Sequence, residues 1–230
     1  MTIEAILFDA DGVLQRPAVP WRQAFERLLG FDAMSLDTFM RDLRAAEFPA
    51  LCAPAGFEDE LAAVLDRWNC AERLTDTLRV LTAIEVYDDV MEAVQALRYC
   101  GVACHLASNQ QSHRARHMSE GMGYRSLFDG EFYSCYLGVA KPDVEYFAAI
   151  LRGLGLPGRS VLFLDDVEAN VAAAREVGLS AVVYDGASGV SELRRLLIEF
   201  GLDVRGCDAR TPRPAPSVSN ACRRGQGARR

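Results

Sequence analysis

Short apolar runs alternate with amphipathic segments along most of this 230-residue chain, and this alternation limits the possible folds most strongly. We expect strands at residues 3–8, 102–107, 132–136, 161–164 and 181–184. Strands that alternate with helices predict a parallel sheet with right-handed crossovers. Because several of the runs are apolar throughout, helices should cover both faces of that sheet. The predicted fold class is therefore α/β, with a Rossmann-like doubly wound parallel sheet.

A long helical block interrupts the alternation after the first strand. It runs from residue 21 to about residue 84 and shows no strand-like alternation. Ser35 is expected to cap its second helix. The block is long enough for a small helical bundle. We therefore expect an α/β core domain of residues 1–16 and 85–202, with a helical domain of residues 17–84 inserted after the first strand.

Charge and composition argue against several classes of protein. Residues 203–230 contain seven Arg and two Asp without core-forming periodicity, which predicts a disordered basic tail. The net charge of the whole chain is −7, so residues 1–202 carry −12. An acidic body argues against nucleic acid as a partner. No apolar run reaches 18 residues and no basic region precedes the first run, so neither a membrane helix nor a signal peptide is expected.

The seven cysteines contain no C-x-x-C pair and lie mostly within the predicted helices and strands. This pattern favours reduced thiols over a disulfide or zinc framework. We therefore expect a cytoplasmic protein without a membrane partner.

The first strand ends in two carboxylates and a glycine, Asp9-Ala10-Asp11-Gly12. Turns favour Asp and Gly, so an ordinary loop is one interpretation. However, Asp9 and Asp11 lie two residues apart and point to the same side of an extended backbone. Their repulsion requires a cation or a shared proton. Mg²⁺ prefers such hard oxygen ligands, and a carboxylate is also a possible nucleophile that forms an aspartyl-phosphate.

Polar residues also follow two other predicted strands. Ser108 and Asn109 follow the second strand, and Asp165 and Asp166 follow the fourth. Ligands of parallel sheets bind beyond the carboxyl ends of the strands, so these side chains should meet Asp9 at one edge. Each pair also fits a plain helix start, where capping residues and carboxylates are favoured.

Lys141 is the single lysine among 25 Lys and Arg residues. It precedes Pro142, so a surface turn is one interpretation of this position. The composition favours Arg wherever either cation would serve, so a lysine here indicates a specific requirement. A compact ammonium fits between a carboxylate and a phosphoryl oxygen, whereas a guanidinium is wider and binds as a fork.

The histidines give a weaker signal. His113 and His117 lie four residues apart on a predicted helix, a spacing used by metal ligands. No third ligand is evident in the sequence, so a solvated helix face is expected. His105 is expected to be a strand residue whose ring has satisfied hydrogen bonds.

Together these features resemble the motifs of the haloacid dehalogenase (HAD) superfamily of phosphohydrolases, over residues 2–200. The motif residues are Asp9 with Asp11, Ser108, Lys141, and Asp165 with Asp166 and Asn170. The helical block after the first motif resembles the C1-type cap of that family. The form Leu164-Asp165-Asp166 with Asn170 is similar to the branch that contains the phosphatase domain of mammalian soluble epoxide hydrolase.

The resemblance implies a role for each motif position. Asp9 matches the nucleophile, and Asp11 matches the general acid and base. Ser108, with Asn109 beside it, matches the group that binds the phosphoryl oxygens of the substrate. Lys141 matches the lysine that holds the nucleophile and the phosphoryl group.

The resemblance also implies a Mg²⁺ cofactor. Asp166 matches the metal carboxylate, and Asp165 is similar to an acidic position that fixes the water shell of the metal. Asp9 completes the set, together with the backbone carbonyl of Asp11.

The resulting hypothesis is a Mg²⁺-dependent phosphatase that acts on a small phosphorylated metabolite. A sugar phosphomutase shares all four motifs and stays open as an alternative. A 2-haloacid dehalogenase lacks the second aspartate of the first motif, so Asp11 argues against it. A non-catalytic binding module should lack a nucleophile or a metal ligand, and none is missing. The sequence leaves the substrate and the oligomeric state open.

Overall fold

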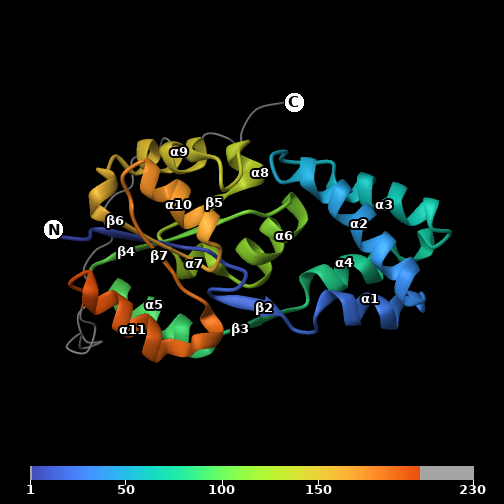
Figure 1. Cartoon of the computed structure of the whole chain (residues 1–230), viewed down its shortest axis with the longest axis horizontal. Helices are drawn as coiled ribbons and strands as arrows, with labels where there is room; N and C mark the ends of the chain where they lie inside the picture. Colours follow the sequence, from blue (N-terminus) through green and yellow to red (C-terminus); the bar gives the residue numbers. More distant parts are fainter. Residues whose placement is uncertain (1, 203–230) are drawn as a thin grey trace.

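The computed structural model describes residues 2–202, so the predicted tail at 203–230 lies outside the described residues. Figure 1 shows the arrangement of the helices and strands. The strands are β1 (Ala5–Phe8), β2 (Gln15–Pro17), β3 (Ile84–Val86), β4 (Ala103–Ser108), β5 (Gly130–Tyr133), β6 (Val161–Asp165) and β7 (Ser180–Val183). The helices are α1 (Trp21–Leu29), α2 (Ala33–Ala50), α3 (Phe57–Arg67), α4 (Leu74–Thr82), α5 (Asp88–Tyr99), α6 (Ser112–Arg116), α7 (Tyr124–Leu127), α8 (Ser134–Leu137), α9 (Val144–Leu154), α10 (Glu168–Glu176) and α11 (Gly189–Glu199).

Five strands form one parallel sheet in the order β5-β4-β1-β6-β7. All five correspond to predicted strands, so the α/β prediction with a doubly wound parallel sheet is confirmed. The first strand of the chain lies at the centre, and all four of its residues are fully buried. A strand of this kind has to be apolar on both faces, and β1 reads Ala-Ile-Leu-Phe for that reason.

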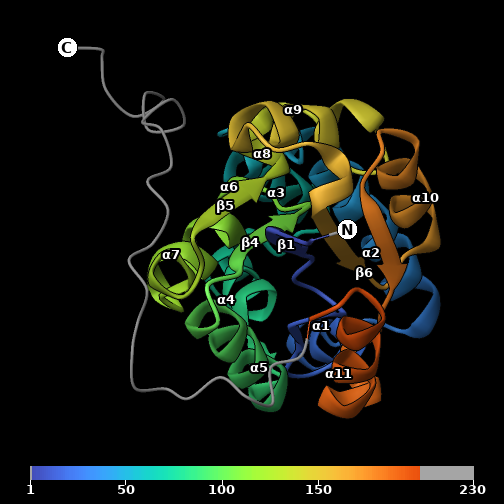
Figure 2. The same ribbon diagram turned by 90° about the vertical axis from the view of Figure 1, so that its left-hand side faces the viewer.

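Alternate residues of β1 pack on opposite faces of the sheet. Ile6 and Phe8 belong to a core that includes residues of α5, α7 and α11, whereas Ala5 and Leu7 belong to a core that includes residues of α9 and α10. Figure 2 shows the sheet between these two groups of helices. The sheet is therefore the middle layer of three, and its carboxyl edge is left for the connecting loops.

Helices α1–α4, called the helical part below, have a hydrophobic core of their own. It contains a group of aromatic rings, with Phe39 in edge contact with Phe25, Phe31 and Trp68. This separation supports the division into a core of residues 1–16 and 85–202 and a helical domain of residues 17–84, which we keep as a proposal.

The structure differs from the prediction at the two points where the chain passes between the sheet and the helical part. The predicted proline-broken link contains β2, and the end of the predicted helical block contains β3, and these two strands pair antiparallel. Three residues are too few for a recognisable period of two. The helix cap is also different, since Asp32 rather than Ser35 precedes α2 and accepts hydrogen bonds from the backbone N–H groups of Met34 and Ser35.

Two other boundaries also differ from the prediction. The third predicted strand is β5, which begins and ends earlier because residues from Ser134 onward turn into α8. The predicted helix at residues 111–122 is α6 followed by a π-helical turn, His117–Gly121.

The cysteine prediction is confirmed only in part. Cys52, Cys70, Cys104 and Cys135 are free thiols, as expected. Cys100 is disulfide-bonded, so the expectation of reduced thiols throughout is wrong at this position. None of the helices within residues 2–202 has the length and apolar character needed to cross a membrane.

Candidate active site

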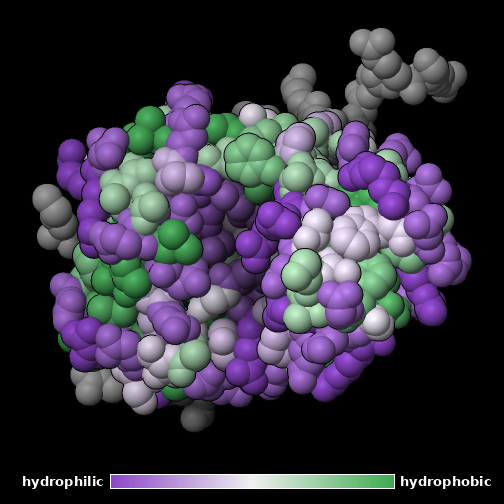
Figure 3. Space-filling model, turned by 45° about the vertical axis from the view of Figure 1, so that its right-hand side comes forward, coloured by the Kyte–Doolittle hydropathy of each residue, from purple (hydrophilic) through white to green (hydrophobic). Residues whose placement is uncertain are grey.

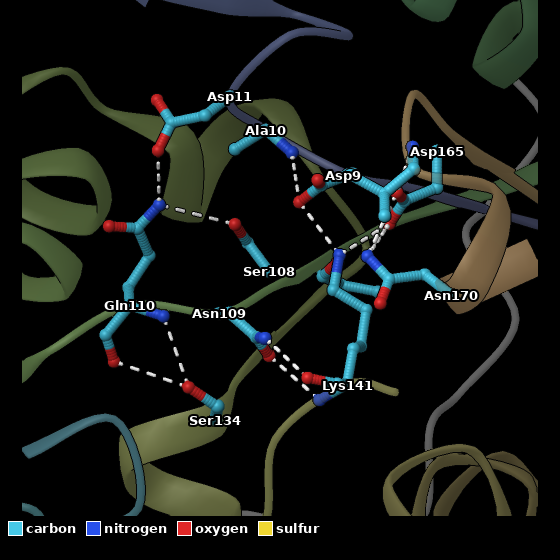
Figure 4. A network of polar contacts seen from close by, with 12 residues as sticks. Asp9, Ala10, Asp11, Ser108, Asn109, Gln110, Ser134, Lys141, Asp165 and Asn170 are labelled. Carbon is cyan, nitrogen blue, oxygen red and sulfur yellow. Dashed lines mark hydrogen bonds and ion pairs between the residues drawn. The ribbon is translucent and has the colours of Figure 1, made fainter. Parts of the chain in front are cut away.

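The predicted site residues converge where three neighbouring strands end. β1 lies between β4 and β6 in register, with Phe8 opposite Leu106 and Leu164. Asp9 directly follows β1, while Ser108 and Asp165 are the last residues of β4 and β6. The parallel arrangement therefore brings these three side chains to one edge of the sheet, as the strand-end rule predicts. Figure 4 shows them close together.

Lys141 joins two of the carboxylates. Its Nζ lies 2.9 Å from Oδ1 of Asp9 and 2.7 Å from Oδ2 of Asp165, and it donates to the backbone oxygen of Ala107 at 2.9 Å. The lysine side chain is 1% exposed. Burial lowers its pKa, but the two carboxylates outweigh this effect and the net direction is upward. The ammonium group therefore stays charged and fixes the distance between two aspartates.

Asp9 has one oxygen that is held and one that is not. Oδ1 accepts hydrogen bonds from Lys141 and from the backbone N–H of Ala10. Within residues 2–202, no donor contacts Oδ2. Burial raises the pKa of this carboxyl to about 7, with Lys141 acting in the opposite direction and Asp165 adding to the rise. A bound cation would favour the charged carboxylate, which is the nucleophilic form.

Asp165 is fully buried and accepts hydrogen bonds from three groups. Besides Lys141, these are the side-chain amide of Asn170 and the backbone N–H of Val167. A buried carboxylate is tolerated only with this degree of pairing. Asp165 therefore orients Lys141 and the start of α10.

Asp9, Asp165 and Asp166 form a cluster in which one carboxylate oxygen from each lies within 4.8 Å of the others. The pKa of Asp166 is raised by burial and by the charge of Asp165. Gly12 makes room for Asp166, because a Cβ on Gly12 would lie 2.3 Å from the Oδ2 atom of Asp166. Hard oxygen donors at this spacing fit Mg²⁺, and the cation would relieve the mutual repulsion of the carboxylates.

The Asp11 carboxylate lies outside this cluster and faces the other way (Figure 4). It accepts hydrogen bonds from Nε2 of Gln110 at 2.8 Å and from Nε2 of Gln15 at 3.0 Å. One terminal nitrogen of Arg114 lies 2.7 and 2.9 Å from its two oxygens. A metal bond from the Asp11 backbone carbonyl stays a prediction.

The Arg114 side chain is 1% exposed and also contacts the helical part. Its guanidinium carbon lies 5.1 Å from the ring centroid of Trp21, at the start of α1. Glu47 of α2 is half-buried and interacts electrostatically with Arg114 and Asp11. Burial and the charge of Asp11 raise the pKa of Glu47, whereas Arg114 and Arg44 lower it. The helical part therefore closes over the side of the site on which Asp11 lies.

Ser108 and Asn109 follow β4 but have different partners. The Ser108 hydroxyl accepts a hydrogen bond from Nε2 of Gln110 at 3.2 Å. Asn109 directs its amide at the backbone of Lys141, donating to its carbonyl oxygen and accepting from its N–H. Asn109 thus positions Lys141, and its predicted contact with substrate stays a prediction.

The histidines differ from their predicted surroundings. His113 is not on a solvated face, because its Nδ1 lies 2.7 Å from Glu58 of α3, which also pairs with Arg116. His117 is partly buried, and burial lowers its pKa. The expectation for His105 is wrong, since its buried Nδ1 has no hydrogen-bond partner among residues 2–202.

Sequence reasoning missed Gln15, Gln110 and Arg114, the three side chains that hold Asp11. Gln110 lies two residues after Ser108, so in an extended backbone the two side chains point to the same side, and this spacing indicates Gln110 as a site residue. Gln15 and Arg114 give no such signal, because their contacts depend on how α6 packs against the loop after β1.

Comparison with known proteins is consistent with this geometry. A family model described as a haloacid dehalogenase-like hydrolase matches residues 3–178. Enolase-phosphatase E1 of Methylococcus capsulatus is 28% identical over 215 residues, which cover 82% of this chain and 92% of that protein. Bifunctional epoxide hydrolase 2 of Sus scrofa is 27% identical over 225 residues, which cover 85% of this chain and 39% of that protein.

A solved structure resembles most of the described fold. It is a HAD family enzyme of Bacteroides thetaiotaomicron, bt-2542, in complex with magnesium and inorganic phosphate. The TM-score is 0.69 at 19% identity, and the match covers 83% of this chain and 98% of that one. At this identity the likeness shows a shared fold.

Proposed function

Because the chain belongs to the haloacid dehalogenase-like hydrolases, we propose that it is a Mg²⁺-dependent phosphatase acting on a small phosphorylated metabolite. The predicted family resemblance is confirmed by this membership. The observation that carries the proposal is the position of Lys141, whose ammonium joins Asp9 and Asp165 and leaves Oδ2 of Asp9 without a donor among the described residues. An acidic side chain, Asp11, lies two residues away.

In the first proposed step, Oδ2 of Asp9 attacks phosphorus. A bond forms between this oxygen and phosphorus while the bond from phosphorus to the alcohol oxygen breaks. Lys141 balances negative charge at the nucleophile, and the Ser108 hydroxyl donates to a phosphoryl oxygen. The leaving alcohol takes its proton from Asp11.

In the second step, water attacks the aspartyl-phosphate. Asp11 removes a proton from this water, phosphate leaves and the Asp9 carboxylate is restored. For both proton transfers, Asp11 exchanges one of its present partners for the substrate or the water. Gln15, Gln110 and Arg114 hold it ready beside the site.

A magnesium ion would be held by Asp9 and Asp166, with Asp165 orienting the surroundings. Bound there, it would supply positive charge against the phosphoryl oxygens. The acidic cluster and the magnesium in the similar bt-2542 structure support this assignment.

The position of the helical part is an argument for a small substrate. Trp21 stacks on Arg114, and Glu58 contacts His113 and Arg116, so residues of α1 and α3 touch α6 beside the catalytic loops. This placement restricts access to the reacting groups from the side of α6. A cytoplasmic location stays a prediction.

The test is a screen of phosphorylated metabolites with Mg²⁺, in which released phosphate is measured. Asp9→Asn serves as the blank, because an amide is a poor nucleophile. The proposal predicts turnover that disappears with EDTA and in the variant. Phosphate release by Asp9→Asn at the wild-type rate would contradict it, and transfer of phosphate to a second position of a sugar would favour the phosphomutase.

A further inference from the structure

Helices α1 and α2 of the helical part border a surface cavity of about 300 Å³, open to solvent, outside the groups described so far. It is lined by Arg22, Asp37, Met40, Arg41 and Arg44. Three guanidinium groups and one carboxylate give the lining a net charge of +2, although residues 1–202 as a whole carry −12. A cationic cavity in an acidic protein concentrates anions locally.

The guanidinium groups of this cavity retain free donors. Arg22 forms a half-exposed ion pair with Asp37, and Arg41 donates to the hydroxyl of Thr38 at 3.0 Å. Arg44 has no hydrogen bond or ion pair with the residues that the structure describes. Since a guanidinium carries five N–H donors, most of them are left for a ligand.

Residues next to the cavity on both helices interact with the Asp11–Arg114 group. On α2, positions 37, 40, 41 and 44 share one face, and Glu47 continues that face three residues later. Glu47 lies within electrostatic reach of Arg44 on one side and of Asp11 and Arg114 on the other. On α1, Arg22 directly follows Trp21, which stacks on Arg114.

The space between the helical part and the sheet is open to solvent. Figure 3 shows a hollow between the two, with hydrophilic residues around it. The rise of an α-helix puts Arg44 about 4.5 Å and Arg41 about 9 Å along α2 from Glu47. A second group of the substrate that reaches the arginines therefore extends about 4.5–9 Å along α2 beyond Glu47.

We propose that this cavity binds a second anionic group of the substrate, a carboxylate or a phosphate carried several bonds away from the scissile phosphoryl group. The inference rests on the proposed phosphatase function and narrows it to phosphate esters with a distal anion. Arginine recognises both anions through paired hydrogen bonds, and α2 supplies two of them one helical turn apart.

A matched pair of substrates tests this inference. The pair is 6-phosphooxyhexanoate and 6-phosphooxyhexanamide, which differ in the charge of the distal group. We expect a higher kcat/KM for the acid, and we expect Arg44→Gln to lower the acid-to-amide ratio about tenfold, the scale for loss of one charged hydrogen bond. The control is Arg79→Gln, an exposed arginine of α4 that pairs with Asp76, and it should leave the ratio unchanged.

A binding measurement separates this inference from the proposed function. Calorimetry on the Asp9→Asn variant compares hexane-1,6-bisphosphonate with hexylphosphonate in the presence of Mg²⁺. Tighter binding of the bisphosphonate, lost in Arg44→Gln, supports the cavity even if neither ester is hydrolysed. Equal affinities, or equal kcat/KM for the acid and the amide, would overturn the inference while hydrolysis of both esters left the phosphatase proposal standing.

Discussion

Replacing Lys141 is the sharpest test of the proposed site. Lys141→Met removes the ammonium that contacts Asp9 at 2.9 Å and Asp165 at 2.7 Å. Both carboxylates then lose their buried cation. Breaking a buried ion pair by removing one partner costs about 3–5 kcal/mol. For a chain of this size that corresponds to a fall in Tm of about 6–20 °C.

Lys141→Arg separates charge from shape. The charge remains, but a planar guanidinium does not fit three acceptors that surround one nitrogen, namely Asp9, Asp165 and the Ala107 carbonyl. We expect the variant to stay folded, with a smaller change in Tm than Lys141→Met. Its kcat should fall about 10²–10³-fold, the scale for loss of one preorganised electrostatic contact.

The assay is steady-state hydrolysis of p-nitrophenyl phosphate with Mg²⁺, together with thermal melts followed by circular dichroism. Mg²⁺ should restore part of the stability of Lys141→Met, because the cation relieves the repulsion between the carboxylates. The control is Arg79→Lys at an exposed ion pair, where the change should be within about 1 kcal/mol. A wild-type kcat in Lys141→Arg would show that the compact shape of the ammonium group is not needed for catalysis and would refute the reasoning.

Three further changes probe the surroundings. Asp11→Asn should lower kcat about 10²–10⁴-fold with an alkyl phosphate and less with an activated aryl phosphate, and equal losses on the two would argue against its role as the acid. Arg114→Met should lower the free energy of unfolding in urea by about 1.5–3 kcal/mol and make a second change, Asp11→Asn, less costly than in the wild type; additive effects would deny their coupling. Burial lowers the pKa of His105 from 6.5 to about 4, so the unfolded chain takes up the proton first and stability should fall between those pH values. The loss should reach about 3 kcal/mol at the acid end and be absent in His105→Gln, as urea titrations at several pH values would show.

The sheet and the catalytic edge were predictable because strong local signals specify them. Buried parallel strands are short apolar runs, and β1 is apolar throughout while β6 is apolar up to its terminal Asp165. The strand-end rule then places Asp9, Ser108 and Asp165 together without any knowledge of the distances. Lys141 was predictable from composition, since one lysine among many arginines is a signal in itself.

The partners of Asp11 were not predictable in the same way. Arg114 is buried within α6, and a helical pattern gives no reason to bury an arginine. Its partners, Asp11 and Trp21, come from the loop after β1 and from α1, so the contact exists only after both parts have packed. The position of Glu47 near this network likewise depends on how the helical part packs against the rest of the chain.

The pairing of β2 with β3 has a consequence for how such a protein can be rebuilt. Pro17 lies opposite Ile84 in that ladder, so the chain leaves and re-enters the sheet domain at neighbouring points. The two hydrophobic clusters around the sheet contain no residue of α1–α4. Residues 18–83 can therefore be exchanged for a short turn or for an unrelated module without stretching the remaining backbone. We expect that the same sheet edge can therefore carry different inserted modules, whether these arise by evolution or by design.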